Sequence, residues 1–416
     1  MSVIDDVASL THEELRARVV AWLHDNLPAQ WIDAVERGDE AAIREARALV
    51  DYAGFCARLG EAGWATPTWP RECGFLGLSG AQTRIVNDEL NRYRAYRSFN
   101  IIGIGMAGPT IIQWGSEEQK HRYLMPMASH TEIWCQLFSE PGAGSDVAGL
   151  ATRAVRDGDE WIVNGQKVWT TLAHIARWGM LVARTDPDQP KHKGLTYFVV
   201  DMHAPGVDVR PLKQMTGDAE FNEVFFSDVR VPDDQRLGPE GEGWAVATTT
   251  LMNERAALSG AGSTGGANVG GGPVDDLVLE AKRSGAWADP VLRDRLVRAV
   301  IEGRIIKMTN LRAAAARRVG QQPGPEGSVT KLFQAEYNRR LQELAVDLRG
   351  GRAMAWPAGD QAAQATVRGF LRSRANTIEG GTSEIMRNIL GERVLGLPKE
   401  PQVDRDIPWK DVRRSG

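Results

Sequence analysis

The sequence contains little cysteine, with only Cys56, Cys73 and Cys135 in 416 residues. These three are scattered, and none has the Cys-x-x-Cys or Cys/His spacing of a zinc site. Proteins that depend on disulfides for stability usually carry many more cysteines, in even number. We therefore expect free thiols, no metal site, and a location in the reducing cytoplasm.

The sequence also lacks long apolar runs and a strong excess of one charge. No stretch approaches the roughly twenty apolar residues of a membrane-spanning helix, and the first residues lack the basic and apolar regions of a signal peptide. The formal net charge of −4 gives no electrostatic reason to expect nucleic acid or an anionic membrane as a partner. We expect a soluble protein long enough for two or three domains with cores of their own.

The hydrophobic pattern divides the chain into three parts. Residues 1–132 carry apolar residues at helical spacing, with Thr11 and Ser116 placed to cap helix N-termini. In 133–240, short β-rich runs alternate with Gly, Pro and Asp turns, which is typical of a compact β-domain. Helical patterns return in 241–416, in blocks near 244–258, 274–284, 290–319, 328–348 and 360–375. We predict an α+β fold with helical domains before and after a central β-domain.

One glycine-rich stretch has the features of an anion-binding turn. It reads Ser139-Glu140-Pro141-Gly142-Ala143-Gly144-Ser145-Asp146 and follows an apolar run. Its proline removes a backbone donor and fixes φ, while its glycines permit conformations that are closed to other residues. Backbone N–H groups and the hydroxyls of Ser139 and Ser145 can therefore face an anion.

Two aromatic segments follow this turn. Trp161 to Val163 is expected to form a short strand between turns at Asp157-Gly158-Asp159 and Asn164-Gly165. A second strand would then carry Trp169 and Thr171 on one face. A ring beside a hydroxyl, close to a phosphate-binding turn, suits a planar phosphorylated cofactor. An ordinary hairpin with a core tryptophan explains the same pattern equally well.

The segment as a whole resembles the flavin-binding middle part of the acyl-CoA dehydrogenase family. In that family a SEPGAGSD-like turn is followed by Asn-Gly-Gln-Lys and a Trp-x-Thr pair, as it is here. The resemblance continues in Gly115–Lys120, Asn253-Glu254-Arg255 and Glu379–Ile385, and covers most of the chain from about residue 50. It implies an N-terminal helical domain, a central β-barrel-like domain and a C-terminal four-helix bundle. It also implies FAD as cofactor, an acyl-CoA substrate and an electron-transferring flavoprotein as electron acceptor.

The resemblance assigns a set of residues to the cofactor. Ser145 would lie near the CoA end of the substrate, and Trp169 and Thr171 beside the flavin ring, with Thr171 within reach of N5. Thr382 and Glu384 would help to hold the ribityl-pyrophosphate and ribose. The complete cofactor set is Gln136, Phe138, Ser139, Gly144, Ser145, Trp169, Thr170, Thr171, Thr382 and Glu384.

Desaturation of a thioester needs a base for the α-proton, and a carboxylate serves if burial raises its pKa toward neutrality. In one family branch the base stands in a Tyr-Glu-Gly-Thr run, and aligning Gly381-Thr382 with it puts Gly380 at the base position and Glu379 one residue early. In a second branch a glutamate on the first C-terminal helix is the base, and Glu254 matches it. We favour Glu254, with Gly380 giving a backbone N–H to the thioester carbonyl and Arg255 giving electrostatic support. Without the family, Glu254 would be interpreted as the partner of a nearby arginine.

The sequence departs from the family in its last third. The Arg-x-x-Phe-Gly motif, whose arginine reaches the FAD of a neighbouring subunit, is absent from 265–285, and a later Gln-x-Phe-Gly-Gly run is reduced to Asp347–Gly351. Arg349, Arg352 or an arginine of a different partner subunit could supply that contact. A homo-oligomer (dimer or tetramer) and a heteromer with a second acyl-CoA dehydrogenase subunit therefore both remain open. Two other functions are open as well, a flavin-dependent oxidase or monooxygenase and a flavin-binding non-catalytic subunit.

Overall fold

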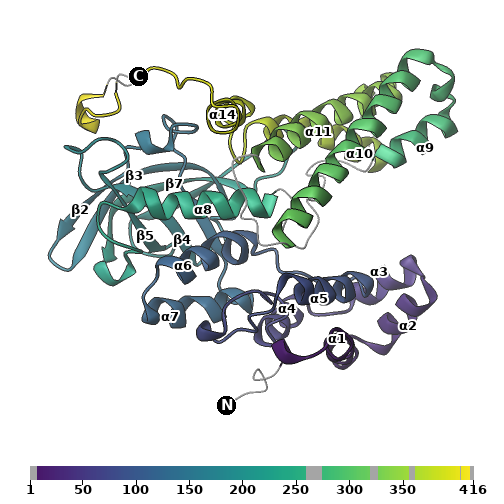
Figure 1. Ribbon diagram of the computed structural model, residues 1–416, viewed down its shortest axis with the longest axis horizontal. Coiled ribbons are helices and arrows are strands. Elements are labelled where there is room, and N and C mark those ends of the chain that lie inside the picture. Colours follow the sequence, from purple (N-terminus) through teal and green to yellow (C-terminus); the bar gives the residue numbers. More distant parts are fainter. Residues whose placement is uncertain (1–6, 259–273, 319–326, 356–360, 403, 413–416) are drawn as a thin grey trace. The chain divides into compact units, whose positions relative to one another are not determined.

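The computed structural model describes residues 7–258, 274–318, 327–355, 361–402 and 404–412, which form two compact units (Figure 1). The first unit contains the described residues up to Leu212, together with Glu220–Glu254 and the chain from Asp404. The second contains Lys213–Ala219 and the described residues between Arg255 and that last segment. Each unit is described by itself.

The first unit begins with a group of helices. They are α1 (His12–Asn26), α2 (Ala29–Arg37), α3 (Glu40–Ala48), α4 (Tyr52–Glu61), α5 (Gly80–Arg92), α6 (Gly108–Trp114) and α7 (Glu117–Ala128). The expected N-caps are present: the Thr11 and Ser116 side chains accept hydrogen bonds from the third helical residue in complete capping boxes. Leu15, Val19 and Leu23 recur on one face of α1 and are fully buried.

A single curled sheet follows in the chain. Its strands are β1 (Trp134–Leu137), β2 (Arg153–Asp157), β3 (Glu160–Thr171), β4 (Trp178–Arg184), β5 (Leu195–Asp201), β6 (Val207–Leu212) and β7 (Phe221–Pro232). The strand order is β1-β4-β2-β3-β7-β6, and β5 pairs with β4. β1 runs parallel to β4, whereas β3 is antiparallel to both β2 and β7. Every residue of β4 is buried, so both faces of the sheet are covered at this strand.

One predicted turn is wrong. Asn164-Gly165 does not end a strand, because β3 continues through it to Thr171, and Trp169 therefore lies on the same strand as Trp161. The pair forms a β-bulge, where the register against β7 shifts between Val163 and Gly165. A Cβ atom at Gly165 would lie 2.4 Å from the Thr152 hydroxyl, so glycine is required here by the close approach of β2.

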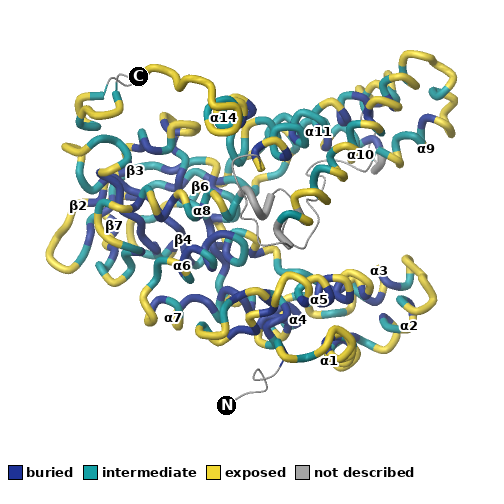
Figure 2. Tube along the Cα trace, viewed as in Figure 1, coloured by how far each residue is buried: buried dark blue, intermediate teal, exposed yellow. Residues whose placement is uncertain are grey.

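Helix α8 (Gly243–Leu258) lies across the sheet (Figure 1). Its buried residues Val246 and Ala247 belong to the same apolar cluster as Val182 and Tyr197 of the sheet and Ile111 of α6. Figure 2 shows this cluster as the continuous dark-blue part of the strands beneath α8 and α6. The carboxyl-terminal turn of α8 that belongs to the first unit is thereby held next to β1.

The second unit is helical. It contains α9 (Val274–Ser284), α10 (Pro290–Arg318), α11 (Gly327–Arg349), α12 (Gly351–Ala355), α13 (Gln361–Ser373) and α14 (Ser383–Ile389). The helical blocks expected from the sequence are found here almost to the residue, while the glycine-rich segment 259–273 lies outside the described residues. A small apolar cluster that includes Ala281, Leu296 and Leu341 joins α9, α10 and α11.

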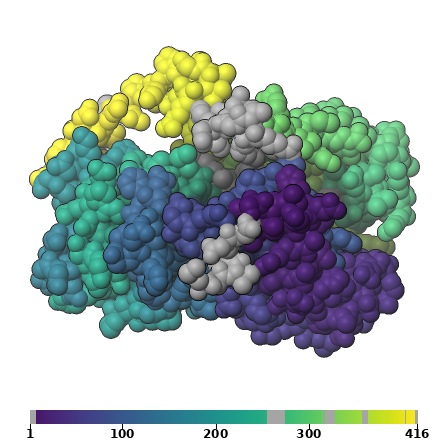
Figure 3. All heavy atoms as spheres, turned by 60° about the horizontal axis from the view of Figure 1, so that its bottom comes forward, coloured from purple at the N-terminus to yellow at the C-terminus, as the bar shows by residue number. Residues whose placement is uncertain are grey.

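The chain finally returns to the first unit. Residues 404–412 pack on the loop between β4 and β5. In the space-filling view the far end of the yellow part of the chain lies against blue and teal atoms from the middle of the chain (Figure 3). No helix in the described part of the chain combines the length and the apolar character that a membrane crossing requires.

Candidate cofactor and catalytic site

The glycine turn is anchored by a buried carboxylate. Glu140 accepts hydrogen bonds from the backbone N–H groups of Ala151 (2.6 Å) and Thr152 (2.9 Å), which follow the turn. It also accepts one from the Lys167 ammonium group at 2.8 Å, and this ammonium donates to the Phe138 carbonyl as well. Burial raises the pKa of the Glu140 carboxyl, but Lys167 and the backbone donors outweigh it and hold the pKa below its ordinary value. Both ends of the turn are thus fixed to one ionised group.

This anchor was not predicted from the sequence. Lys167 was noted only as part of the Asn-Gly-Gln-Lys motif, although its side chain is completely buried. Lys167 follows the buried Trp161 and Val163 along β3, and a charge buried there requires a charged partner because an unpaired buried charge is costly.

The outer side of the turn has free backbone donors. Gly142, Gly144, Ser145 and Asp146 are exposed, and within the described residues their N–H groups make no hydrogen bond. Successive unpaired amides on an exposed turn form a concave set of partial positive charges that binds anions. The turn therefore has the unpaired amides that an anion-binding turn requires, and its binding of phosphate groups stays a prediction.

The end of β3 is held beside this turn in an unusual conformation. Val168 donates its N–H to the Ser139 carbonyl at 2.9 Å. Trp169 has φ +61°, at a second bulge between Lys167 and Thr170. A left-handed conformation is uncommon for an aromatic residue and indicates a functional constraint. Here the indole is 60% exposed and makes an edge contact with Phe221, with 5.9 Å between the ring centroids. An exposed indole next to an anion-binding turn fits a planar ring that carries phosphates.

The two threonines after Trp169 differ in environment. Thr170 is buried, and its carbonyl accepts a hydrogen bond from the Asn222 amide at 2.9 Å. Thr171 pairs with Phe221 of β7 and is half-buried. The backbone of this pair is therefore fixed against β7, and the place of Thr171 beside the flavin ring stays a prediction.

β1 and α8 bring two of the predicted residues into contact. The Gln136 side-chain amide donates to the Glu254 carboxylate at 3.3 Å. Phe138, two residues further along the chain, is buried edge-on against Tyr197 at 5.9 Å. The favoured base therefore lies next to one of the residues assigned to the cofactor. The side chain of Arg255, which follows Glu254, is outside the described residues.

A buried hydroxyl network fixes the helix that carries Glu254. The Thr250 hydroxyl, one helical turn earlier, lies 3.0 Å from the Thr110 hydroxyl of α6 and 3.1 Å from the Tyr197 hydroxyl of β5. All three side chains are fully buried. Because α8 is bonded in this way to both a helix and a strand, the position of Glu254 is set by the first unit's core.

The remaining predicted residues lie in the second unit. Gly380 and Gly381 have φ values of +63° and +96°, which only glycine adopts without strain. Thr382 caps α14 by accepting a hydrogen bond from Ile385, and Glu384 is exposed and paired with Arg387. These observations describe local structure and leave their proposed roles toward FAD as predictions.

Glu379, the rival base, is engaged on both oxygens. The Arg372 guanidinium donates to its two carboxylate oxygens at 3.3 and 2.9 Å, and the Asn376 amide donates to one of them at 2.8 Å. These three hydrogen bonds fix the geometry of the carboxylate.

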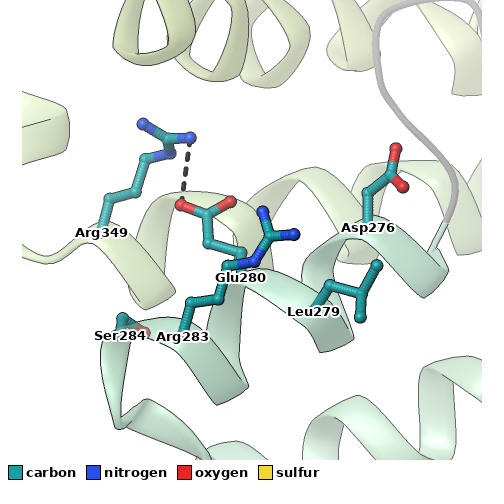
Figure 4. Close-up of a pocket in the computed structure, with 6 residues that line it drawn as sticks. All are labelled: Asp276, Leu279, Glu280, Arg283, Ser284 and Arg349. Atoms are coloured by element: carbon teal, nitrogen blue, oxygen red, sulfur yellow. Dashed lines mark ion pairs between the residues drawn. The ribbon is translucent and has the colours of Figure 1, made fainter.

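The segment Asp347–Gly351, where the family's Gln-x-Phe-Gly-Gly run is reduced, borders a pocket of about 610 Å³ between α9 and α11 (Figure 4). Arg349 pairs there with Glu280 at 3.0 Å, and Asp347 pairs with Arg295 at 2.7 Å. The full lining is Asp276, Leu279, Glu280, Arg283, Ser284 and Arg349. The pocket carries acidic and basic groups in equal number, and Arg349 is neutralised within its own chain.

Three family models match consecutive parts of the chain between residues 9 and 395. The model of the acyl-CoA dehydrogenase N-terminal domain matches residues 9–131, that of the middle domain 135–229, and that of the C-terminal domain 241–395. Among curated proteins, the chain is similar to acyl-CoA dehydrogenase IpdE1 of Mycobacterium tuberculosis. The identity is 42% over 388 residues, covering 93% of this chain and 98% of that protein.

Solved structures show the same likeness. The Tcur3481-Tcur3483 steroid ACAD is 29% identical, with a TM-score of 0.74 over 94% of this chain and 98% of that chain. The ChsE4-ChsE5 complex from Mycobacterium tuberculosis is also 29% identical, with a TM-score of 0.70 over 96% of this chain and 100% of that chain.

Proposed function

Since this chain belongs to the acyl-CoA dehydrogenase family of FAD-dependent oxidoreductases, we propose that it oxidises an acyl-CoA thioester to the trans-2-enoyl-CoA. Glu254 acts as the base that removes the α-proton. The contact between the Glu254 carboxylate and the Gln136 amide carries this proposal, because it joins the base to the strand that leads into the glycine turn. When bound, FAD supplies the acceptor for the hydride that leaves the β-carbon.

The residues of the chain divide the remaining work. The Gln136 amide orients the Glu254 carboxylate, and the Thr250 network keeps its helix in place. Trp169 and Thr171 border the flavin ring, and the amides of the glycine turn bind phosphate groups. Gly380 and Arg255 keep the roles that the family resemblance implies, carbonyl polarisation and electrostatic support.

The acyl group is proposed to be large and to contain rings. The likeness to the Tcur3481-Tcur3483 steroid ACAD supports this, since that protein is described as acting in steroid chemistry. A panel of CoA thioesters with straight-chain, branched and steroid-derived acyl groups tests it. Preference for straight chains would contradict it.

The assembly is proposed to be a dimer or tetramer in which the C-terminal helices meet a second chain. α10 exposes an apolar stripe at helical spacing, Val297, Ile301, Ile305 and Met308. Contiguous exposed apolar residues of this kind mark interfaces. The two-component relatives ChsE4-ChsE5 and Tcur3481-Tcur3483 favour a heteromer, and so does the pairing of Arg349 with Glu280, which leaves the family's arginine contact to a different chain.

The test is anaerobic reduction of the flavin by an accepted acyl-CoA. Glu254→Gln keeps the shape of the side chain and its hydrogen bond to Gln136 but cannot accept the proton. The rate should fall by about 10²–10⁴, the usual contribution of a general base. Glu379→Gln is the matched control, since it removes a carboxylate that already pairs with Arg372, and it should reduce the flavin at close to the wild-type rate. The reverse result would place the base at Glu379.

A further inference from the structure

The C-terminal segment (residues 404–412) is attached by its backbone to the loop between β4 and β5. The Trp409 N–H donates to the Gln189 carbonyl at 2.9 Å, and the Lys410 N–H donates to the Pro187 carbonyl at 3.1 Å. Figure 1 shows this part of the chain returning from α14 to the strands. The segment is thus a built part of the first unit.

Side chains of this region bind carbonyls of the residues that directly follow the glycine turn. The buried Arg184 guanidinium donates to the Ala148 carbonyl at 2.6 Å and the Leu150 carbonyl at 3.3 Å. The Trp409 indole N–H donates to the Gly149 carbonyl between them at 3.2 Å. The indole ring also covers the Arg184 guanidinium, 4.6 Å from its centroid. Three successive carbonyls just after the turn are therefore held, while the unpaired amides within the turn belong to exposed residues.

An ammonium group makes a second connection. Lys191 lies between Asp146 of the glycine turn and Asp404 of the C-terminal segment, 3.0 Å from a carboxylate oxygen of each. Its side chain is only 15% exposed, so it is confined between the two carboxylates. The Lys191 ammonium group also neutralises part of the negative charge of Asp146, which would otherwise repel a phosphate.

We propose that the C-terminal segment is a positioning element for the glycine turn, ordering it to bind the phosphate groups of a nucleotide ligand. The inference rests on the proposed function, which supplies two such ligands, the nucleotide end of CoA and the pyrophosphate of FAD. Gly142 and Gly144 give the turn more conformational freedom than other residues would, and ordering it in advance removes an entropic cost from binding. Trp409 and Lys191 act through the turn and need not touch the ligand.

The experiment uses the full-length, FAD-loaded protein with Trp409→Ala, titrated calorimetrically with coenzyme A and with pantetheine, which lacks the nucleotide. We expect the dissociation constant for coenzyme A to rise about tenfold, the effect of losing one cation–π contact and one hydrogen bond behind the turn. Binding of pantetheine should not change. If the turn serves FAD instead, the variant should lose flavin absorbance during gel filtration while coenzyme A binding is retained. Trp409→Phe keeps the ring over Arg184 and should lie between wild type and alanine.

Lys410→Ala is the matched control. Lys410 belongs to the same segment but pairs with Asp188, away from the turn, and both side chains are exposed. Equal weakening of coenzyme A and pantetheine, or no change in either ligand or in FAD retention, would overturn the inference. If Trp409→Ala does not fold, Lys191→Met is used in its place, with the same comparison of coenzyme A binding, pantetheine binding and FAD retention. Wild-type protein that binds neither coenzyme A nor FAD would overturn the proposed function itself.

Discussion

Replacing Lys167 by methionine tests how strongly the buried anchor holds the glycine turn. The change keeps the length of the side chain but removes the ammonium group, and with it the hydrogen bonds to Glu140 and Phe138. Lys167 is completely buried and Glu140 almost so, which means that water cannot replace the lost partner. Removing one member of a buried ion pair typically costs about 3–5 kcal/mol. We expect the lower end, about 3 kcal/mol, because Ala151 and Thr152 still donate to the carboxylate.

The assay is denaturant unfolding of Lys167→Met, Glu140→Gln and the double variant. The double variant should lose less stability than the two single variants lose in sum. When both partners are replaced, no unpaired charge is left in the core. If Lys167→Met lowers the free energy of unfolding by less than about 1 kcal/mol, the reasoning is refuted, because an exposed ion pair contributes that much.

The same anchor predicts the pH dependence of stability. The folded-state pKa of Glu140 lies below its ordinary value. The ionised carboxylate therefore contributes fully to stability above the unfolded-state pKa of about 4.3, and this contribution is lost as the pH falls through the folded-state pKa. Wild-type protein should therefore lose stability below about pH 4.3 more steeply than Glu140→Gln does. Parallel acid profiles for the two proteins would show that Glu140 is not ionised in the folded state.

Three further results are expected. The protein should purify yellow with FAD, and Trp169→Ala should weaken FAD retention without affecting folding, because the indole is 60% exposed. Colourless protein that takes up no added FAD would contradict this, and uptake only with a co-expressed second chain would favour the heteromer. Light scattering should report a dimer or tetramer, and Ile301→Asp in the α10 stripe should shift the population toward smaller species. A stable wild-type monomer at micromolar concentration would contradict the proposed assembly. Cys73 is partly exposed and should react with a thiol reagent well before Cys135. Complete burial blocks access to the Cys135 thiol and raises its pKa. Equal reaction rates would contradict this order.

The helices and the fold class could be predicted because the relevant signals are local. Capping residues such as Thr11 and Ser116 and the 3.6-residue spacing of apolar side chains act within a few residues of the chain. The glycine turn was also visible, since proline and glycine restrict the backbone wherever they stand.

The errors come from interactions between distant parts of the chain. Asn164-Gly165 has the composition of a tight turn, but β7 continues to pair beside it, and the chain forms a bulge instead. No local pattern predicts that Trp169 adopts φ +61°, because that conformation follows from the register of β3 against its neighbour. The contact of Gln136 with Glu254 joins residues 118 positions apart and could be reached only through the family resemblance.

The path of the chain has a consequence for biosynthesis. Lys191 and Asp404 are 213 residues apart, and the whole helical unit is made between them. During translation the sheet can pair as soon as β7 has left the ribosome, since domains fold as their residues become available. The residues around the glycine turn nevertheless lack the contacts of Asp404 and Trp409 until residues 404–412 have been made. A nascent chain that has not yet reached Asp404 would therefore carry a paired sheet whose proposed phosphate-binding turn still lacks this support.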